Sequence, residues 1–72
     1  MTVAARVVLF SKPDCPLCEE ATAMLEAMGV TFEPAADPAY ADRVPVITVD
    51  GAIVTEGRVS ERAVRRALRR AR

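Results

Sequence analysis

The 72-residue chain contains no histidine and no tryptophan, and it has only two cysteines and three aromatic residues. The absence of histidine excludes histidine-based acid and base catalysis and the common histidine-containing metal sites. Two cysteines cannot supply the four ligands of a closed cysteine zinc site within one chain. The cysteine chemistry of a single chain is therefore limited to what two thiols can do.

Long apolar runs are also missing. No apolar stretch approaches the roughly 18 residues of a membrane-spanning helix, so no membrane partner is expected. Residues 1–10 contain neither a long hydrophobic segment nor an A-x-A cleavage site, so we expect no secretory signal and a cytoplasmic location. Apolar residues make up 51% of the chain and charged residues 28%, a balance typical of a folded globule. We expect residues 1–72 to form one domain and to be a monomer.

The formal net charge is zero, but the charges are segregated along the chain. Residues 1–57 carry three basic and nine acidic residues, a net charge of −6, whereas residues 58–72 carry seven basic residues and one acidic residue, a net charge of +6. A solvated helix face is the simpler interpretation of the basic segment, and docking to an acidic protein partner is the alternative. Aromatic residues do not alternate with the arginines, so no nucleic-acid partner is expected. The arginines on the predicted helix face are Arg62, Arg65, Arg66, Arg69, Arg70 and Arg72.

The first half of the chain shows a strand, helix, strand pattern. Val7–Phe10 is a short apolar run rich in β-branched residues, which predicts a strand buried on both faces. Pro16 suits the first turn of a following helix, and Gly29 suits its end. Val30–Glu33 predicts a second strand, parallel to the first. The apolar face predicted for the helix consists of Leu17, Ala21, Met24, Leu25 and Met28.

The second half predicts a hairpin and a helix. Residues 34–43 have room for no more than one helical turn, from Asp37 to Tyr40. We expect Tyr40 to pack over the loop, with a place in the substrate groove as the alternative. Val46–Val49 and Ala52–Thr55 flank an Asp-Gly pair, the strongest short-range signal of a β-hairpin. Ser60 is predicted to cap the last helix. The order β-α-β-β-β-α indicates an α/β fold with a four-stranded mixed sheet and two main helices. The apolar face predicted for the last helix consists of Ala63, Val64, Ala67, Leu68 and Ala71.

The sequence Cys15-Pro16-Leu17-Cys18 carries the chemistry. Cys15 falls at the start of the predicted helix, where unpaired N–H groups and the helix dipole favour a thiolate, the nucleophile of disulfide exchange. Cys18 lies nearly one turn later on the same side, and Pro16 stiffens the turn between them. The spacing favours a redox-active dithiol. Two buried structural cysteines, or half of a metal site shared between two chains, remain as alternatives.

Val44-Pro45 precedes the third predicted strand. Proline is tolerated at the first residue of a strand, so the pair has a plain structural interpretation as strand punctuation. Next to a C-x-x-C sequence, a cis proline here would leave the backbone of Val44 free to pair with an extended substrate.

Residues 7–18, the following helix and residues 44–51 together resemble the glutaredoxin branch of the thioredoxin-like superfamily, and most of all its short bacterial members. The resemblance implies a minimal thioredoxin-like fold in which Cys15 attacks a disulfide, Cys18 resolves the mixed disulfide and Pro45 is a cis proline facing them. In glutathione-using relatives, a lysine before the motif and the backbone at the Val-Pro pair hold the tripeptide, and Lys12, Val44 and Pro45 match those places.

The chain also departs from the glutaredoxin pattern. Leu17 stands where these relatives usually carry tyrosine, and Gly57, Arg58 and Ser60 stand where they carry a glycine pair and a helix cap. The resemblance implies no tightly bound cofactor, with glutathione, another low-molecular-weight thiol or a reductase as electron donor. We therefore expect a thiol–disulfide oxidoreductase that reduces protein or small-thiol disulfides, the alternative being a non-catalytic module that binds a soft metal or one protein partner. The candidate substrate contacts of the expected oxidoreductase are Lys12, Pro16, Leu17, Val44, Pro45, Gly57, Arg58 and Ser60.

Overall fold

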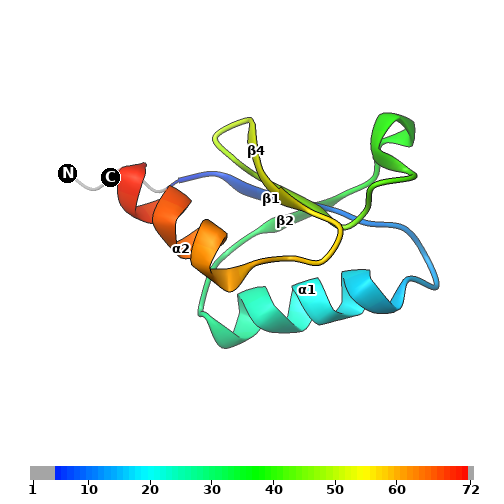
Figure 1. Ribbon diagram of the computed structural model, residues 1–72, viewed down its shortest axis with the longest axis horizontal. Coiled ribbons are helices and arrows are strands. Elements are labelled where there is room, and N and C mark those ends of the chain that lie inside the picture. The colour runs from blue at the N-terminus through cyan, green and yellow to red at the C-terminus, as the bar shows by residue number, and fades with distance from the viewer. Residues whose placement is uncertain (1–4, 72) are drawn as a thin grey trace.

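A computed structural model describes residues 5–71 (Figure 1). Its strands form one mixed sheet in the order β2-β1-β3-β4, in which β1 is parallel to β2 and the other neighbouring pairs are antiparallel. This arrangement confirms the predicted α/β order and the minimal thioredoxin-like fold. The elements are β1 (Val7–Phe10), α1 (Pro16–Ala27), β2 (Glu33–Ala35), the 3-10 turn η1 (Pro38–Tyr40), β3 (Val46–Val49), β4 (Ala52–Glu56) and α2 (Glu61–Arg70).

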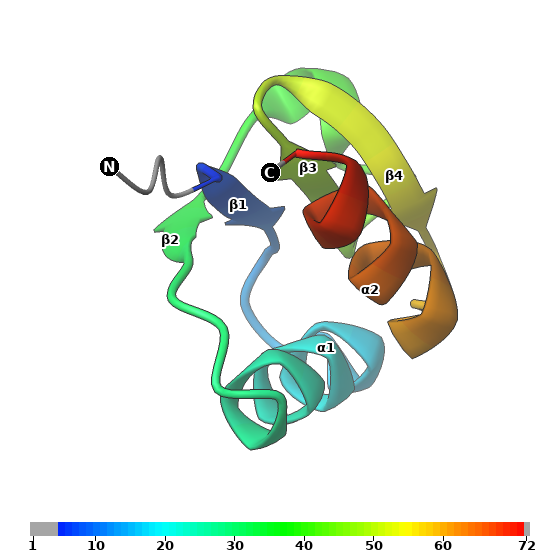
Figure 2. The same cartoon turned by 90° about the vertical axis from the view of Figure 1, so that its left-hand side faces the viewer.

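Both α-helices lie on one side of the sheet, and η1 lies on the other (Figures 1 and 2). The prediction that β1 is buried on both faces is therefore wrong: Val7 and Leu9 are buried, but Val8 and Phe10 on the opposite face are only half-buried. A single turn of 3-10 helix is too short to cover that face. The Tyr40 ring packs edge-on against Phe10, with 4.8 Å between ring centroids. No helix among residues 5–71 is long and apolar enough to cross a membrane.

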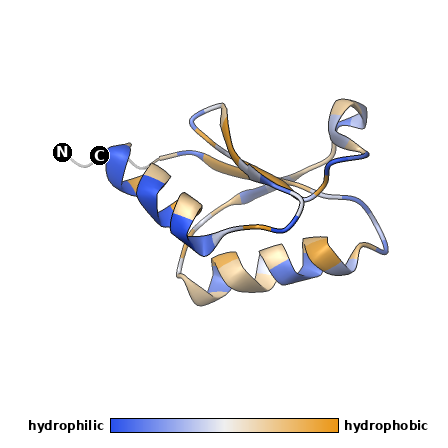
Figure 3. Ribbon diagram, in the orientation of Figure 1, coloured by the Kyte–Doolittle hydropathy of each residue, from blue (hydrophilic) through white to orange (hydrophobic). Residues whose placement is uncertain are grey.

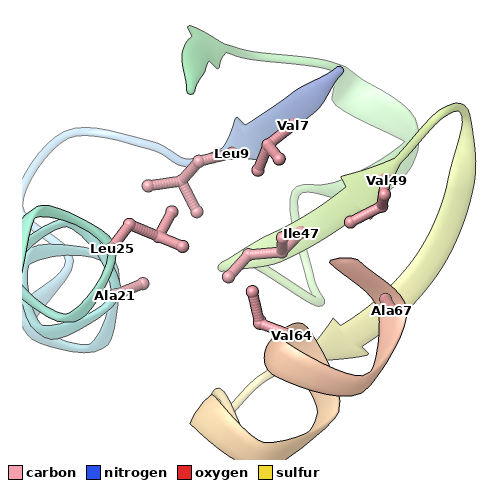
Figure 4. Close-up of a cluster of buried hydrophobic side chains, with 8 residues drawn as sticks. All are labelled: Val7, Leu9, Ala21, Leu25, Ile47, Val49, Val64 and Ala67. Carbon is pink, nitrogen blue, oxygen red and sulfur yellow. The ribbon is translucent and has the colours of Figure 1, made fainter. Parts of the chain in front are cut away.

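The hydrophobic core lies between the helices and the sheet (Figure 4). Each helix contributes two side chains spaced three or four residues apart, which is the spacing that places them on the same helix face. The strands contribute alternate residues, as a sheet with its core on one face requires. Within residues 5–71, the buried side chains of this cluster are Val7, Leu9, Ala21, Leu25, Ile47, Val49, Val64 and Ala67.

The buried stripe of α1 differs from the predicted one at its first turn. Leu17 is 39% exposed, whereas Cys18, Ala21 and Leu25 are buried. Cys18 takes the inward position because it precedes Ala21 by three residues and Leu25 by seven, so that these three share a face. Leu17 is turned away from that face, and the prediction that it packs in the core is wrong.

The second strand begins three residues later than predicted. Gly29 adopts a left-handed conformation with φ of 73°, and the Val30 N–H donates to the Leu25 carbonyl at 3.0 Å. The hydrogen bonds that close the C-terminus of α1 therefore include the first residue of the predicted strand. Val30 and Phe32 pack against the core from the connection, and pairing with β1 starts at Glu33. Proline within β2 is tolerated because β2 is an edge strand.

The hairpin and the last helix follow the sequence signals. Asp50 and Gly51 have φ values of 52° and 87°, as the tight turn between twisted antiparallel strands requires. An irregularity in the pairing of β3 with β4 follows Ile47, and β4 extends to Glu56, one residue beyond the prediction. The Ala63 N–H donates to Ser60 Oγ at 3.2 Å, which confirms Ser60 as the cap of α2.

We predict that Leu25→Ala lowers the free energy of unfolding by about 2–5 kcal/mol, because it removes a fully buried side chain and leaves a cavity. The same substitution at exposed Leu17 is the matched control and should change this free energy by less than about 1 kcal/mol. Urea unfolding followed by circular dichroism measures both. Equal losses in the two variants would contradict this assignment of the buried face.

Candidate active site

The chain turns sharply from β1 into α1, and this turn positions Cys15. Asp14 has a φ of 56°, a left-handed conformation that aspartate tolerates better than most residues. Cys15 then occupies the N-cap of α1 in extended conformation. Its sulfur accepts a hydrogen bond from the Cys18 N–H, with 3.2 Å between N and Sγ. The sulfur thus takes the place of a capping oxygen at the end of α1 where N–H groups lack helical partners.

Cys18 lies deeper, on the buried side of the first turn. Both cysteines are free thiols and both are buried. Burial raises the pKa of the Cys18 thiol, and the hydrogen bond and charge of Cys15 raise it further, while Lys12 opposes the shift. The Thr22 hydroxyl donates to the Cys18 carbonyl at 3.1 Å. Cys18 therefore keeps its proton to higher pH than an ordinary thiol.

Both cysteines line one hollow, which we call the dithiol hollow, with a volume of about 370 Å³. A neighbouring hollow of about 200 Å³ is lined by η1 and by Val44. Ser11 and Lys12 line both, so the two hollows meet along this loop. The Lys12 Nζ lies 3.5 Å from the Ala41 carbonyl oxygen, to which it donates. Lys12 is thus the cation between the cysteines and the Val44 segment.

The Val44-Pro45 peptide bond is cis, as the resemblance implied. The Gly57 N–H donates to the Pro45 carbonyl at 2.9 Å and to the Arg43 carbonyl at 3.2 Å, so the segment after β4 braces this loop. Within residues 5–71, the N–H and carbonyl groups of Val44 have no hydrogen-bond partner. These two groups are therefore available to a bound chain.

Arg43 supports the same loop and is the residue that sequence reasoning missed. Its N–H donates to the Tyr40 carbonyl at 2.8 Å, and its guanidinium lies over the Tyr40 ring, 5.1 Å from the centroid. A guanidinium nitrogen of Arg43 also lies 3.6 Å from a carboxylate oxygen of Glu56. The sequence does carry a signal for this role: Arg43 is a cation directly before Val44-Pro45, and it follows the only tyrosine of the chain by three residues.

The other predicted substrate contacts do not line the two hollows. Pro16 and Leu17 are exposed on the first turn of α1, and neither lines the two hollows. Arg58 is exposed, with no ion pair or hydrogen bond to residues 5–71. The Ser60 hydroxyl is engaged as the cap of α2, and its N–H donates to the Thr55 hydroxyl at 3.2 Å. Gly57 contacts the Val44-Pro45 loop through its backbone alone.

The described part of the chain holds no group of three or more cysteine, aspartate or glutamate side chains arranged to bind a metal ion. A metal shared between two chains would need ligands from both. Toward a soft metal, the cysteines of one chain supply two thiols.

The model of the family described as Glutaredoxin-like domain (DUF836) matches residues 6–69. The chain belongs to this glutaredoxin-like family. The match includes both cysteines of the glutaredoxin-like domain, its Val44-Pro45 loop and nearly all of α2. No curated protein matches the chain.

We predict that the stability contributed by Cys18 decreases at alkaline pH. The unfolded chain releases the Cys18 proton at the ordinary thiol pKa, about 8.5, whereas the folded protein retains it to higher pH. The free-energy difference between the reduced wild type and Cys18→Ala should therefore be largest below about pH 8 and shrink as the pH rises toward 10. Urea unfolding under reducing conditions measures the difference. A difference that is constant or grows with pH would contradict the raised pKa.

Proposed function

We propose that this glutaredoxin-like domain is a dithiol thiol–disulfide oxidoreductase that reduces disulfides of proteins or of low-molecular-weight thiols. The observation that carries the proposal is the Cys15 sulfur at the N-cap of α1, hydrogen-bonded by the Cys18 N–H and lining an open hollow. An N–H donor and the helix dipole both stabilise negative charge on that sulfur. The proposed nucleophile is therefore Cys15.

The reaction follows from the positions of the two thiols. The Cys15 thiolate attacks one sulfur of a substrate disulfide, forming a mixed disulfide and expelling the other substrate sulfur as a thiolate. The Cys18 thiol then gives up its proton and its sulfur attacks Cys15 Sγ, which forms the Cys15–Cys18 disulfide and releases the second substrate thiolate. The substrate gains two electrons and the protein loses two.

The raised pKa of Cys18 suits the resolving role in this scheme. A protonated Cys18 does not repel the Cys15 thiolate while the mixed disulfide forms. Its N–H bond to Cys15 also places it next to the sulfur that it must attack. The expelled substrate thiolate is a suitable acceptor for the Cys18 proton.

The Val44-Pro45 loop offers a place for the substrate backbone. The N–H and carbonyl groups of Val44 have the donor and acceptor that an extended peptide needs for two hydrogen bonds. Lys12, between the two hollows, supplies a cation for a substrate carboxylate. Glutathione, another carboxylated thiol and an extended protein segment all fit this combination.

Two electrons from outside the protein must return the disulfide to the dithiol. We propose glutathione, another low-molecular-weight thiol or a reductase as the donor, with no tightly bound cofactor. The direction of the reaction as proposed requires a reducing compartment such as the cytoplasm.

We predict a reversible two-electron transition of the Cys15–Cys18 pair between about −300 and −120 mV. The measurement is equilibration of metal-free protein in defined thiol buffers, followed by alkylation and mass spectrometry.

With a disulfide substrate, Cys15→Ser should abolish exchange, and Cys18→Ser should accumulate a mixed disulfide at Cys15.

Full activity of Cys15→Ser would refute the proposed mechanism. In the protein as purified, before any metal is removed, thiols that resist alkylation until a chelator is added would instead support a module that binds a soft metal between two chains. Serine is close in size to cysteine and keeps a capping acceptor at position 15, and circular dichroism of both variants serves as the control for folding.

We also predict that Lys12→Gln raises the KM for a carboxylated small-thiol disulfide about two- to fivefold, because it removes one solvent-exposed ion pair with the substrate. The KM for the neutral 2-hydroxyethyl disulfide should stay within experimental error. Arg62→Gln makes the same charge change on α2, outside both hollows, and is the control. Steady-state kinetics with both substrates measures the effect. An equal rise of the KM for the carboxylated and the neutral disulfide would contradict the role of Lys12.

A further inference from the structure

A third hollow lies at the opposite end of α1 from the cysteines. Its floor consists of Met28, Val30 and Leu68, all half-buried, and its rim carries the exposed side chains of Arg65 and Arg69. Its volume is about 390 Å³. We call these five residues the basic hollow. It combines an apolar floor with two cations, so it suits an apolar group flanked by negative charge.

The basic hollow belongs to a larger basic surface on α2. Within α2 the chain has five arginines and a single glutamate, and the outward side of the helix is strongly hydrophilic (Figure 3). Among residues 5–71, the only ion pair of α2 joins Arg65 to Glu61, at 2.7 Å. The arginines that have no carboxylate partner in the described part of the chain are Arg62, Arg66, Arg69 and Arg70.

The apolar side of α2 packs in the core, because Val64 and Ala67 are buried against the sheet. The helix therefore cannot turn an apolar face to a membrane without leaving the core. What it presents outward is a row of cations, two of which border the apolar floor of the basic hollow.

We propose that the basic hollow docks an acidic protein segment, which inserts one apolar side chain between Arg65 and Arg69 and pairs its carboxylates with the arginines of α2. Charge complementarity selects this occupant. Burial of an aliphatic side chain against the apolar floor is favourable. The guanidinium groups bind carboxylates through paired hydrogen bonds.

Nucleic acid fits the same surface less well. Arginines on α2 have no aromatic neighbours within the helix on which bases could stack. A long polyanion would also extend over the rest of the chain, which is acidic, with a net charge of −6 over residues 1–57. A short acidic segment can remain on the basic surface alone.

A partner at the basic hollow does not cover the dithiol hollow, since the two hollows share no lining residue. Cys15 caps the start of α1 and Met28 caps its end, which separates them by about 20 Å along the helix axis. A partner held at the basic hollow can therefore be bound whether the dithiol is reduced or oxidised. The proposal does not depend on the redox activity.

The test uses the peptide Glu-Asp-Glu-Leu-Glu-Asp-Glu-amide with fluorescein attached to its N-terminal amine, titrated with the full chain and followed by fluorescence anisotropy at low salt. Arg65→Gln combined with Arg69→Gln should weaken binding about tenfold. Arg62→Gln combined with Arg66→Gln is the matched control: it makes the same charge change on the same helix outside the hollow and should weaken binding about twofold. A peptide with serine in place of leucine should bind about tenfold more weakly than the original.

A measurement without variants accompanies these titrations. The methyl resonances of Met28 and Leu68 in the wild-type chain should shift on addition of the leucine peptide and should shift much less at the same concentration of the serine peptide. This measurement keeps the test valid if a double variant fails to fold, which circular dichroism would reveal.

Several results would overturn the proposal. Equal weakening by the two double variants would show that the peptide responds to net charge alone. Absence of peptide binding at low salt, or tighter binding of a DNA oligonucleotide of equal charge, would exclude an acidic protein segment as the preferred occupant. A dimer in sedimentation that the Arg65 and Arg69 changes abolish would assign the hollow to a second copy of this chain.

Discussion

The packing of α1 against the sheet is the contact on which the dithiol depends. Ala21 and Leu25 are completely buried beside Leu9 and Ile47, and this packing fixes the rotation of α1 about its axis. That rotation turns Cys18 inward and leaves Cys15 at the free N–H end of the helix. In so small a core each contact carries a large share of the stability, so the geometry of the two sulfurs and the stability of the fold rest on the same side chains.

The sheet brings a second segment to this end of the molecule. Strand β3 is buried along its whole length, and the loop before it carries Val44-Pro45. This loop is held from two directions, by the Gly57 N–H after β4 and by Arg43, which also contacts Tyr40 and Glu56. The free backbone groups of Val44 thus lie on a braced support, and a preorganised site loses less conformational entropy when a substrate binds.

Much of this arrangement could be predicted because its signals are local. The Asp-Gly turn, the cap at Ser60 and the helix start at Cys15 each depend on the conformational preferences of a few adjacent residues. The predicted start of the second strand is wrong because Val30 and Phe32 have the pattern of a strand but pack on the core from a connection. The spacing of Leu17 fits an apolar helix stripe and predicts a core position, yet only contact with the sheet decides which of two overlapping stripes is buried.

The sequence by itself determined the order of the elements, the hairpin, the helix caps and the presence of two thiols one helical turn apart, since each follows from residues near each other in the chain. The tertiary structure decided the raised pKa of Cys18, the meeting of the two hollows at Lys12, the bracing of the loop by Arg43 and the basic hollow between α1 and α2. Burial, charge proximity and concave shape arise between segments distant in the chain, and no local pattern encodes these distances.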